Sequence, residues 1–280
     1  MSENELYPLP RNAEEAKRLN TQHQVWTKVV GYHVHPTIES KLPAQPHIAD
    51  IGTGTAAFLI DMAKQYPTAT LDGFDISDKQ FPPVPSTIKL HLHDLRQPFP
   101  ARFHNRYDLV HLRLLFTAID PSAWSSTISN LAALLRPGGA IQWVEPGSEF
   151  SYVGTKAHNL TSPTHPTCEP VYTAKLAMEF VDFLADKCDF SKRLPDLLKT
   201  AGLVNVLQDI VPSNRDPELG QALCGTTVGG MIGWQKAIAV TPAGIRPLSE
   251  VEELAEKVQA ERDQGMMLFY DVHVTVAFKP

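Results

Sequence analysis

The chain has 280 residues, of which 43% are hydrophobic and 20% are charged, with a formal net charge of −6. This is the composition of a soluble globular protein with a substantial core, and the scattered Lys and Arg residues argue against nucleic-acid binding. No apolar run approaches the roughly 20 residues that span a bilayer, the N-terminus lacks a secretory signal, and three cysteines without metal-ligand spacing suit a reducing compartment. We therefore expect a cytoplasmic protein that binds neither nucleic acid nor membrane.

Helices and strands are predicted to alternate through the first half of the chain. The expected elements are helices over 12–30 and 36–41, a strand over 47–51, a helix over 55–65, strands over 69–75, 87–92 and 107–111, a helix over 122–135 and a strand over 140–145. Such alternation implies right-handed crossovers and a largely parallel sheet that is covered on both faces.

The second half of the chain is less regular. A proline-rich loop is expected over 146–170, and loops of that length in compact domains are usually functional or disordered. The remaining expected elements are helices over 171–187, 193–201, 218–239 and 249–263, and strands over 203–210 and 269–278. The last strand alternates between an apolar face and a polar face that carries Asp271, His273 and Thr275. We expect seven strands in one sheet and a single domain over 1–280.

The stretch from His47 to Phe58 predicts a ligand-binding turn. A short apolar strand ends at Asp50, and Gly52 and Gly54 allow a tight turn into the following helix. Taken alone, this turn fits a dinucleotide site as well as an S-adenosylmethionine site. Asp75 and Asp94, which follow the second and third strands, favour the latter.

A set of five motifs extends this interpretation. Asp-Ile-Gly-Thr-Gly, Phe-Asp-Ile-Ser, His-Asp-Leu, Tyr-Asp-Leu-Val-His-Leu-Arg and Leu-Arg-Pro-Gly-Gly together resemble class I S-adenosylmethionine-dependent methyltransferases. Within that class the chain is similar to the branch common in fungal secondary-metabolite clusters, which includes a regulator of secondary metabolism. The similarity covers roughly residues 5–147.

This resemblance implies an α/β, Rossmann-like fold with a seven-stranded, mostly parallel sheet and an antiparallel last strand. It also implies S-adenosylmethionine as the cofactor. The corresponding parts of this chain are an N-terminal helical lid over 1–45, a cofactor-binding core over 46–147, and substrate-cap insertions over 148–200 and 213–265.

The resemblance also assigns cofactor contacts by position. Asp50, Gly52 and Gly54 would border the methionine part, and Asp75 the ribose. Ile76 and Leu95 would flank the adenine, with Asp94 at its edge, and Arg113 would lie near the methionine carboxylate or the acceptor. The chain departs from the family at Ala56, which replaces the third glycine and adds a methyl group to the pocket.

Methyl transfer depends on positioning and on removal of a proton from the acceptor. His111 is the first candidate base, because it ends the fourth strand at the carboxyl edge of the sheet; a structural histidine is the alternative. Glu145, at the end of the fifth strand, is the second, and it could instead cap a helix or a loop. His158 and His165 lie in the proline-rich loop, where solvated histidines are the alternative.

Four side chains are predicted to contact the substrate, although each could equally belong to the core: Trp26, Tyr32, Met231 and Trp234. Two His-x-His pairs, His33/His35 and His91/His93, invite a metal interpretation. No third ligand is spaced to complete either site, and we expect no metal.

The leading hypothesis is a methyltransferase that acts on oxygen or nitrogen of a small hydrophobic natural product in secondary metabolism. One alternative is a methyltransferase-like cyclase or pericyclase that binds the cofactor without methyl transfer. Another is a cofactor-binding regulatory protein that acts through protein partners. A homodimer is compatible with each of these.

Overall fold

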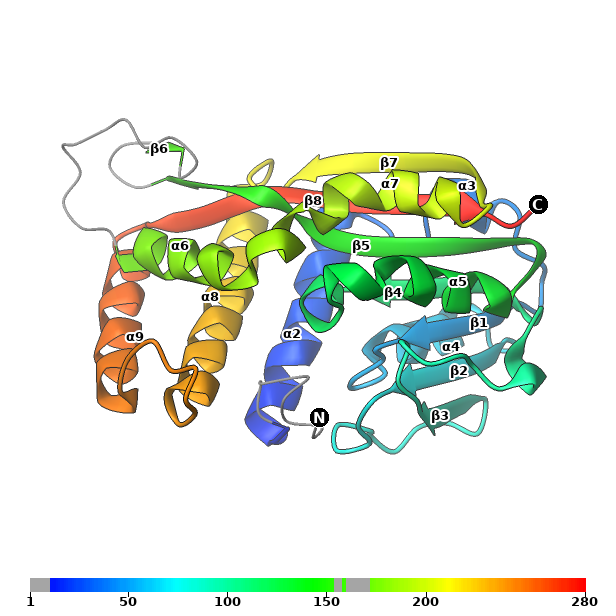
Figure 1. Cartoon of the computed structure of the whole chain (residues 1–280), viewed down its shortest axis with the longest axis horizontal. Coiled ribbons are helices and arrows are strands. Elements are labelled where there is room, and N and C mark those ends of the chain that lie inside the picture. The colour runs from blue at the N-terminus through cyan, green and yellow to red at the C-terminus, as the bar shows by residue number, and fades with distance from the viewer. Residues whose placement is uncertain (1–10, 154–157, 160–171) are drawn as a thin grey trace. The chain divides into compact units, whose positions relative to one another are not determined.

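The computed structural model describes residues 11–153, 158–159 and 172–280 (Figure 1). The chain divides into two compact units. Unit 1 consists of Met1–Val29, Gly147–Cys188 and Pro212–Asp271, and unit 2 of Val30–Pro146, Asp189–Val211 and Val272–Pro280. The expected single domain with a lid and cap insertions stays a prediction.

The helices and strands follow the predicted order. The α-helices are α2 (Ala13–Val30), α3 (Pro36–Glu39), α4 (Ala57–Gln65), α5 (Trp124–Leu134), α6 (Tyr172–Leu184), α7 (Phe190–Thr200), α8 (Pro217–Ala239) and α9 (Leu248–Asp263). The strands are β1 (His47–Ile51), β2 (Thr70–Asp75), β3 (Ile88–Leu92), β4 (Tyr107–Arg113), β5 (Leu135–Val153), β6 (His158–Asn159), β7 (Val204–Pro212) and β8 (Met267–Phe278). None of the helices in these ranges is both long and apolar enough to cross a membrane.

The sheet has the strand order β3-β2-β1-β4-β5-β8-β7, and the two-residue β6 pairs with β5. The pairs β1–β2, β1–β4, β2–β3 and β4–β5 are parallel. At the end of β8, Lys279 donates its backbone N–H to Gly139 near the start of β5, so β8 runs antiparallel to β5. The mostly parallel sheet with an antiparallel last strand is thereby confirmed.

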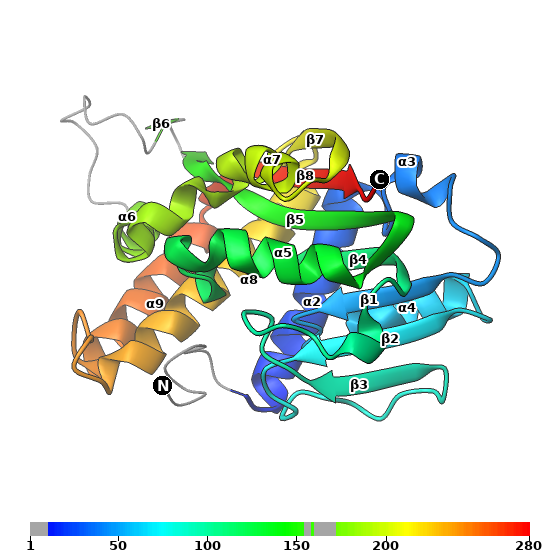
Figure 2. The same cartoon turned by 45° about the vertical axis from the view of Figure 1, so that its right-hand side comes forward.

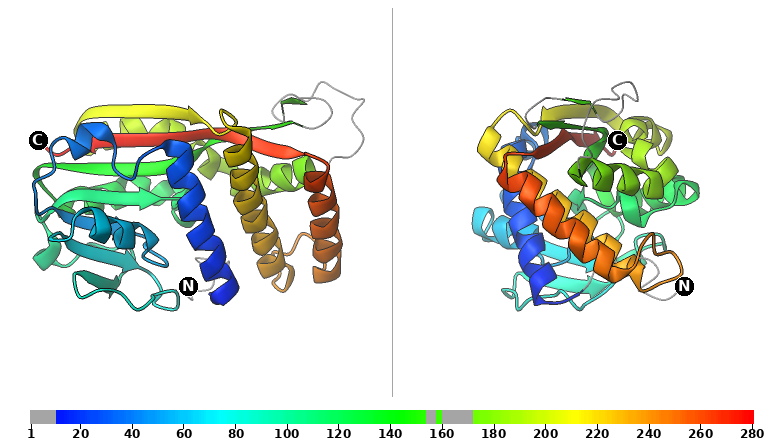
Figure 3. Two further views of the ribbon diagram at one scale, coloured as in Figure 1. Left: turned by 180° about the vertical axis from the view of Figure 1, so that it is seen from behind. Right: turned by 90° about the vertical axis from the view of Figure 1, so that its left-hand side faces the viewer.

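Alternating side chains of the strands in unit 2 form two apolar layers. One layer packs under α5 and α7 and includes Ile51, Val110, Trp143 and Phe190. The other packs under α3 and α4 and includes Ile48, Leu109, Phe58 and Met62. Figure 2 shows α5 in front of β4 and β5, and the left view of Figure 3 looks onto the opposite face. Because both faces are covered, the carboxyl ends of the parallel strands are the edge at which polar side chains can meet a ligand.

Unit 1 is built on packed helices. α6, α8 and α9 contact one another in pairs, and Arg18 of α2 donates to the carbonyl of Thr226 in α8 at 3.4 Å. Glu261 of α9 accepts the backbone N–H groups of Tyr172 and Thr173 at 2.6 and 2.7 Å, which satisfies donors at the start of α6.

Two predictions of local structure were wrong. The strand expected over 140–145 extends from Leu135 to Val153, so residues 136–139 lie in β5 rather than capping a helix and residues 147–153 do not belong to a loop. In each case the local structure depends on pairing with a neighbouring strand, which the pattern of residues within the segment does not indicate. Residues 154–157 and 160–171 of the expected loop lie outside the described residues.

Candidate functional site

The turn between β1 and α4 has the backbone that the glycine pattern predicts. Gly52 has φ of +68°, a region that favours glycine, and its N–H donates to Phe74 of β2 at 2.8 Å. The N–H of Thr53 donates to the same carbonyl at 3.0 Å. A Cβ at Gly52 would lie 2.5 Å from Cδ2 of Leu115, so the residue after β4 packs directly on this turn.

Ala56 ends the turn in a left-handed conformation, with φ of 55°, and is fully buried. An L-residue in this region carries a backbone cost of about 1 kcal/mol that glycine avoids. The replacement of the family's third glycine by Ala56 therefore has two effects: it adds a methyl group, and it places an L-residue in a strained backbone conformation.

Asp75 joins the end of β2 to the glycine turn. Its Oδ2 accepts the backbone N–H of Gly54 at 2.8 Å, and its Oδ1 accepts that of Ser77 at 3.1 Å. Burial raises the pKa of this carboxyl, while the backbone N–H groups of Gly54, Ser77 and Ile76 partly oppose the shift. Each carboxylate oxygen can accept two hydrogen bonds, so Asp75 retains acceptor capacity for hydroxyl groups.

Asp94, which was expected at the edge of the adenine, is held by its neighbour. Its Oδ1 accepts Nε of Arg96 at 2.8 Å and its Oδ2 accepts Nη2 at 2.5 Å, and this pairing lowers the pKa of Asp94. Ile76 and Leu95, the two expected adenine contacts, are each half-buried. Leu95 packs against the core layer under α5.

His111 and Asp50 form a buried pair across β4 and β1. Nδ1 of His111 donates to Oδ1 of Asp50 at 2.8 Å, and Thr53 Oγ1 donates to Oδ2 at 2.7 Å. The His111 ring stacks on Phe58 at 3.8 Å between centroids and 11° between planes. Burial lowers the pKa of His111, although Asp50 opposes the shift, so the ring is neutral near pH 7 with its lone pair on Nε2.

Glu145 lies inside β5, and its two carboxylate oxygens have different surroundings. Oε1 accepts the indole N–H of Trp143 at 2.6 Å and the backbone N–H groups of Leu115 and Phe116 at 2.8 and 3.1 Å. Oε2 is buried and has no hydrogen-bond partner among the described residues. Burial raises the pKa of Glu145 to about 8, and the nearby Arg113 opposes that shift. Glu145 therefore holds the loop after β4 through Oε1, while its Oε2 accepts no hydrogen bond from the described residues.

Arg113 ends β4, the strand between β1 and β5. Burial lowers its pKa to about 10, while the charges of Asp50 and Glu145 act in the opposite direction. Asp50, His111 and Arg113 therefore lie in the last residues of β1 and β4, and Glu145 lies beside them inside β5, which continues to Val153. The expected position of Glu145 at the end of the fifth strand was thus wrong, and the catalytic and cofactor roles of these residues stay predictions.

Three of the four expected substrate contacts belong to unit 1. Trp26 is buried beside Tyr270, with 6.2 Å between ring centroids, and the hydroxyl of Tyr270 lies 2.8 Å from Thr227 Oγ1. Met231 and Trp234 are buried on α8, and Trp234 contacts Phe183 of α6. The indole N–H groups of both tryptophans are buried, and neither has a hydrogen-bond partner in the part of the chain that the structure describes.

Tyr32 belongs to unit 2, whereas the other three residues belong to unit 1. Its hydroxyl donates to Asp209 at 3.3 Å and its ring meets His35 edge-on at 5.4 Å. His158 lies in β6, where its backbone pairs with Tyr152, but its side chain falls outside the described part of the chain, as does the whole of His165.

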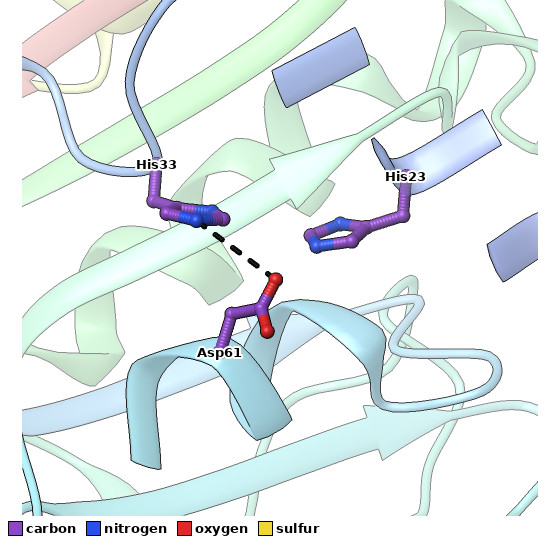
Figure 4. A group of neighbouring side chains, drawn as sticks. All are labelled: His23, His33 and Asp61. Atoms are coloured by element: carbon purple, nitrogen blue, oxygen red, sulfur yellow. Dashed lines mark ion pairs between the residues drawn. The ribbon is translucent and has the colours of Figure 1, made fainter. Parts of the chain in front are cut away.

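The four histidines of the His-x-His pairs have separate partners. Nε2 of His33 lies 3.8 Å from Asp61 Oδ2 (Figure 4). His35 contacts Thr37 at 2.7 Å and Asp209 at 3.0 Å. His91 contacts Asp72 at 2.7 Å, and His93 contacts the carbonyl of Gln97 at 3.3 Å. His33 also belongs to a group with His23 and Asp61 whose ligand atoms all lie within 4.8 Å of one another, which is close enough to hold a metal ion (Figure 4). The expectation that no further ligand lies near this pair was therefore wrong, and the absence of a metal stays a prediction.

Sequence reasoning missed three residues that shape this site. Leu115 covers Gly52, Phe58 stacks on His111, and Arg96 holds Asp94. The spacing of Arg96, two residues after Asp94, was a signal that could have been used. The contacts of Leu115 and Phe58 join different strands and helices, and no local pattern indicates them.

Comparison with known proteins gives three similarities. Residues 33–207, more than half of the chain, match the family model described as "Methyltransferase domain". The chain is 37% identical over 154 residues to methyltransferase grgD of a Penicillium species, covering 51% of this chain and 53% of that protein. It is 34% identical over 140 residues to N-methyltransferase sirN of Leptosphaeria maculans, covering 50% of this chain and 49% of that protein. The matches thus span about half the length of these curated relatives.

The fold is similar to that of a solved structure of Haemonchus contortus phosphoethanolamine N-methyltransferase 2 in complex with S-adenosyl-L-methionine. The TM-score is 0.52 and the sequence identity 15%, covering 91% of this chain and 53% of that chain. At this identity the likeness concerns the fold alone.

Proposed function

The chain belongs to the methyltransferase domain family, and from this premise we propose that it binds S-adenosylmethionine and catalyses methyl transfer to a nitrogen or oxygen atom of a small apolar natural product. The observation that carries the proposal is the Gly52–Ala56 turn, with Asp75 bonded to its backbone and a buried Asp50–His111 pair beside it. The similarity to a relative named N-methyltransferase supports nitrogen as the methylated atom.

The polar atoms of unit 2 fit this cofactor. Asp75 retains acceptor capacity that suits the two ribose hydroxyls. Arg113 suits a carboxylate. Ile76 and Leu95 would flank the adenine, and Asp94 retains one acceptor position on Oδ2 beside its arginine. When bound, S-adenosylmethionine supplies an electrophilic methyl group on its sulfonium sulfur.

His111 is the proton acceptor in this proposal. Asp50 fixes its orientation through Nδ1, which leaves the lone pair of Nε2 for a proton of the acceptor, and the neutral ring is the form that can take that proton. Glu145 is less suited to this task because Oε1 already accepts three N–H groups. His158 stays a prediction from its position in the chain.

Trp26, Met231 and Trp234 of unit 1 stay predicted contacts of the acceptor, as does Tyr32 of unit 2, each from its place in the sequence. The unpartnered indole N–H groups of Trp26 and Trp234 favour an acceptor that carries oxygen atoms able to accept hydrogen bonds. A buried donor without a partner costs about 1–3 kcal/mol, and a bound oxygen atom would remove that cost.

The function is tested by incubating the protein with S-adenosylmethionine and a panel of apolar amines, amides and phenols, and by measuring S-adenosylhomocysteine and methylated product. We expect both products in equal amounts, from a nitrogen-bearing member of the panel. A substrate that rearranges while the cofactor stays unconverted would favour the cyclase hypothesis. Cofactor binding without any turnover, together with a stable complex with protein partners, would favour the regulatory hypothesis.

A further inference from the structure

Asp50 lies between two buried hydrogen-bond donors. Its Oδ1 accepts Nδ1–H of His111 at 2.8 Å, and its Oδ2 accepts the hydroxyl of Thr53 at 2.7 Å. The side chains of all three residues are buried. Hydrogen bonds that are shielded from water are electrostatically stronger than exposed ones, and successive bonds in a chain polarise one another. The hydroxyl of Thr53 therefore influences His111 through the carboxylate that they share.

The backbone brings Thr53 to the level of this pair. Gly73, Asp50 and His111 are register partners on the adjacent parallel strands β2, β1 and β4. Thr53 follows β1 in the glycine turn, and its backbone N–H donates to the carbonyl of Phe74, the residue after Gly73, at 3.0 Å. The turn is thus tied to β2 one residue beyond the row that contains Asp50 and His111.

Packing fixes the direction of the Thr53 hydroxyl. A Cβ at Gly73 would lie 2.9 Å from Cγ2 of Thr53, so the methyl group of Thr53 occupies the space that a side chain at Gly73 would need. Rotation about χ1 is restricted in a β-branched side chain, and a methyl group that is packed on one side fixes the hydroxyl on the other. The hydroxyl therefore points to Asp50 because the methyl group packs on β2.

We propose that Thr53 is a positioning residue for methyl transfer, whose hydroxyl holds the Asp50 carboxylate in the orientation that keeps the proton of the neutral His111 ring on Nδ1. This inference rests on the proposed function, in which Nε2 of His111 takes the proton of the acceptor. A neutral imidazole can accept a proton only at the nitrogen that carries none, so the tautomer decides whether Nε2 is available.

Removal of the hydroxyl leaves Oδ2 of Asp50 buried without this donor. The carboxylate charge is then compensated less, and the protonated ring of His111, which stabilises that charge, becomes more favourable. We therefore expect the substitution to raise the pKa of His111, against the lowering that burial produces in the wild type. Arg113 and His33, the other ionisable groups that influence the ring, are unchanged. Less of the neutral, proton-accepting ring is then present near pH 7.

The test compares Thr53→Val, Thr53→Ser and the control Thr68→Val. Valine replaces the hydroxyl with a methyl group, whereas serine keeps the hydroxyl and removes the methyl group. Thr68 is exposed before the start of β2, and its hydroxyl donates to the carbonyl of Ala44 at 3.3 Å, so its loss concerns a different contact. Nitrogen NMR of the full chain labelled with isotopic histidine follows the tautomer and titration of His111, whose signals are assigned by their loss in His111→Gln.

We expect the titration midpoint of His111 to move to higher pH in Thr53→Val, to stay close to the wild-type value in Thr53→Ser, and to be unchanged in Thr68→Val. With an acceptor that the wild type methylates, kcat should fall by about tenfold in Thr53→Val, a loss of the size of one hydrogen bond. The dissociation constant for S-adenosylhomocysteine should stay within about twofold in all three variants.

An unchanged titration of His111 in Thr53→Val would overturn the inference, and so would equal losses of kcat in the valine and serine variants, which would assign the effect to the methyl group. The wild type alone provides a further test, because a neutral His111 with its proton on Nε2 would contradict the proposed arrangement without any variant. A shifted titration in Thr53→Val, together with a wild type that methylates no acceptor, would instead contradict the proposed function, so the two failures are distinguishable.

Discussion

Glu145 holds the backbone of the loop after β4 through one of its carboxylate oxygens. Through Oε1 it fixes the backbone of Leu115 and Phe116, and Leu114 before them adopts φ of 58°, a conformation that side-chain-bearing residues rarely take. Unusual backbone of this kind persists only where surrounding contacts determine it, and it is concentrated at functional sites. The residue that holds this loop, Glu145, also carries Oε2, which accepts no hydrogen bond from the described residues.

The ionisation of Glu145 makes the stability of the protein depend on pH. Burial raises its pKa from 4.5 to about 8, so the folded state binds a proton that the unfolded state has released in this range. The contribution of Glu145 to stability is fully present below about pH 4.5 and is lost as the pH rises through 8. Between pH 5 and pH 8 we expect the wild type to lose about 3 kcal/mol of unfolding free energy relative to Glu145→Gln.

Urea denaturation of both proteins across this pH range measures that difference. The other ionisable groups are common to the two proteins and cancel in the comparison. Parallel curves for the wild type and the variant would show that Glu145 is already ionised in the folded protein at pH 5.

At the scale of elements, the turn from β1 to α4 combines backbone and packing constraints. Gly52 needs its positive φ, and it also needs the space that Leu115 occupies. Gly138 has φ of +78° as well, but a Cβ there would meet nothing within 4 Å. An alanine at Gly138 would therefore add backbone strain alone, whereas an alanine at Gly52 would add both backbone strain and a steric contact.

We expect Gly138→Ala to cost about 1 kcal/mol of unfolding free energy through strain alone, and Gly52→Ala to cost about 2–4 kcal/mol because overpacking is added. Thermal and chemical denaturation of both variants measures these values. Equal losses of unfolding free energy in the two variants would mean that Leu115 moves aside without cost. In the double variant Gly52→Ala/Leu115→Ala, the overpacking part of the Gly52→Ala loss should be largely absent.

Much of the fold could be predicted from the sequence, because local patterns determine it. β1 was predicted at its observed bounds, and the strand-turn-helix unit around Gly52 follows from glycine chemistry and apolar patterning. β5 could not be predicted in full, since its extension to Val153 depends on contacts outside the segment, such as Phe150 against Tyr270 at 5.3 Å. His111 and Glu145 were likewise identified by their positions in the sequence, but their contacts could not be predicted. His111 contacts Asp50 and Phe58, and Glu145 accepts the N–H of Leu115, and all three partners belong to other elements or loops.

At the scale of the whole molecule, the residues assigned to the cofactor belong to one compact unit. Asp50, Asp75, Asp94, Arg113 and Glu145 all lie in the Val30–Pro146 segment of unit 2. Trp26, Met231 and Trp234, proposed to contact the acceptor, belong to unit 1, and β5 has residues in both units. We infer that cofactor affinity is set by unit 2, and that substitutions of the three acceptor residues change acceptor binding more than cofactor binding.

The measurement that tests the central claim most directly is calorimetric titration of the full chain with S-adenosylhomocysteine, carried out for the wild type, Asp75→Asn and Asp78→Asn. Asp75 carries the acceptor capacity assigned to the ribose, whereas Asp78 is an exposed carboxylate three residues away and serves as the matched control. We expect one binding site in the wild type, unchanged affinity in Asp78→Asn, and a loss of about tenfold or more in Asp75→Asn. No binding to the folded wild type at millimolar ligand, or equal affinity of Asp75→Asn and the wild type, would contradict the account.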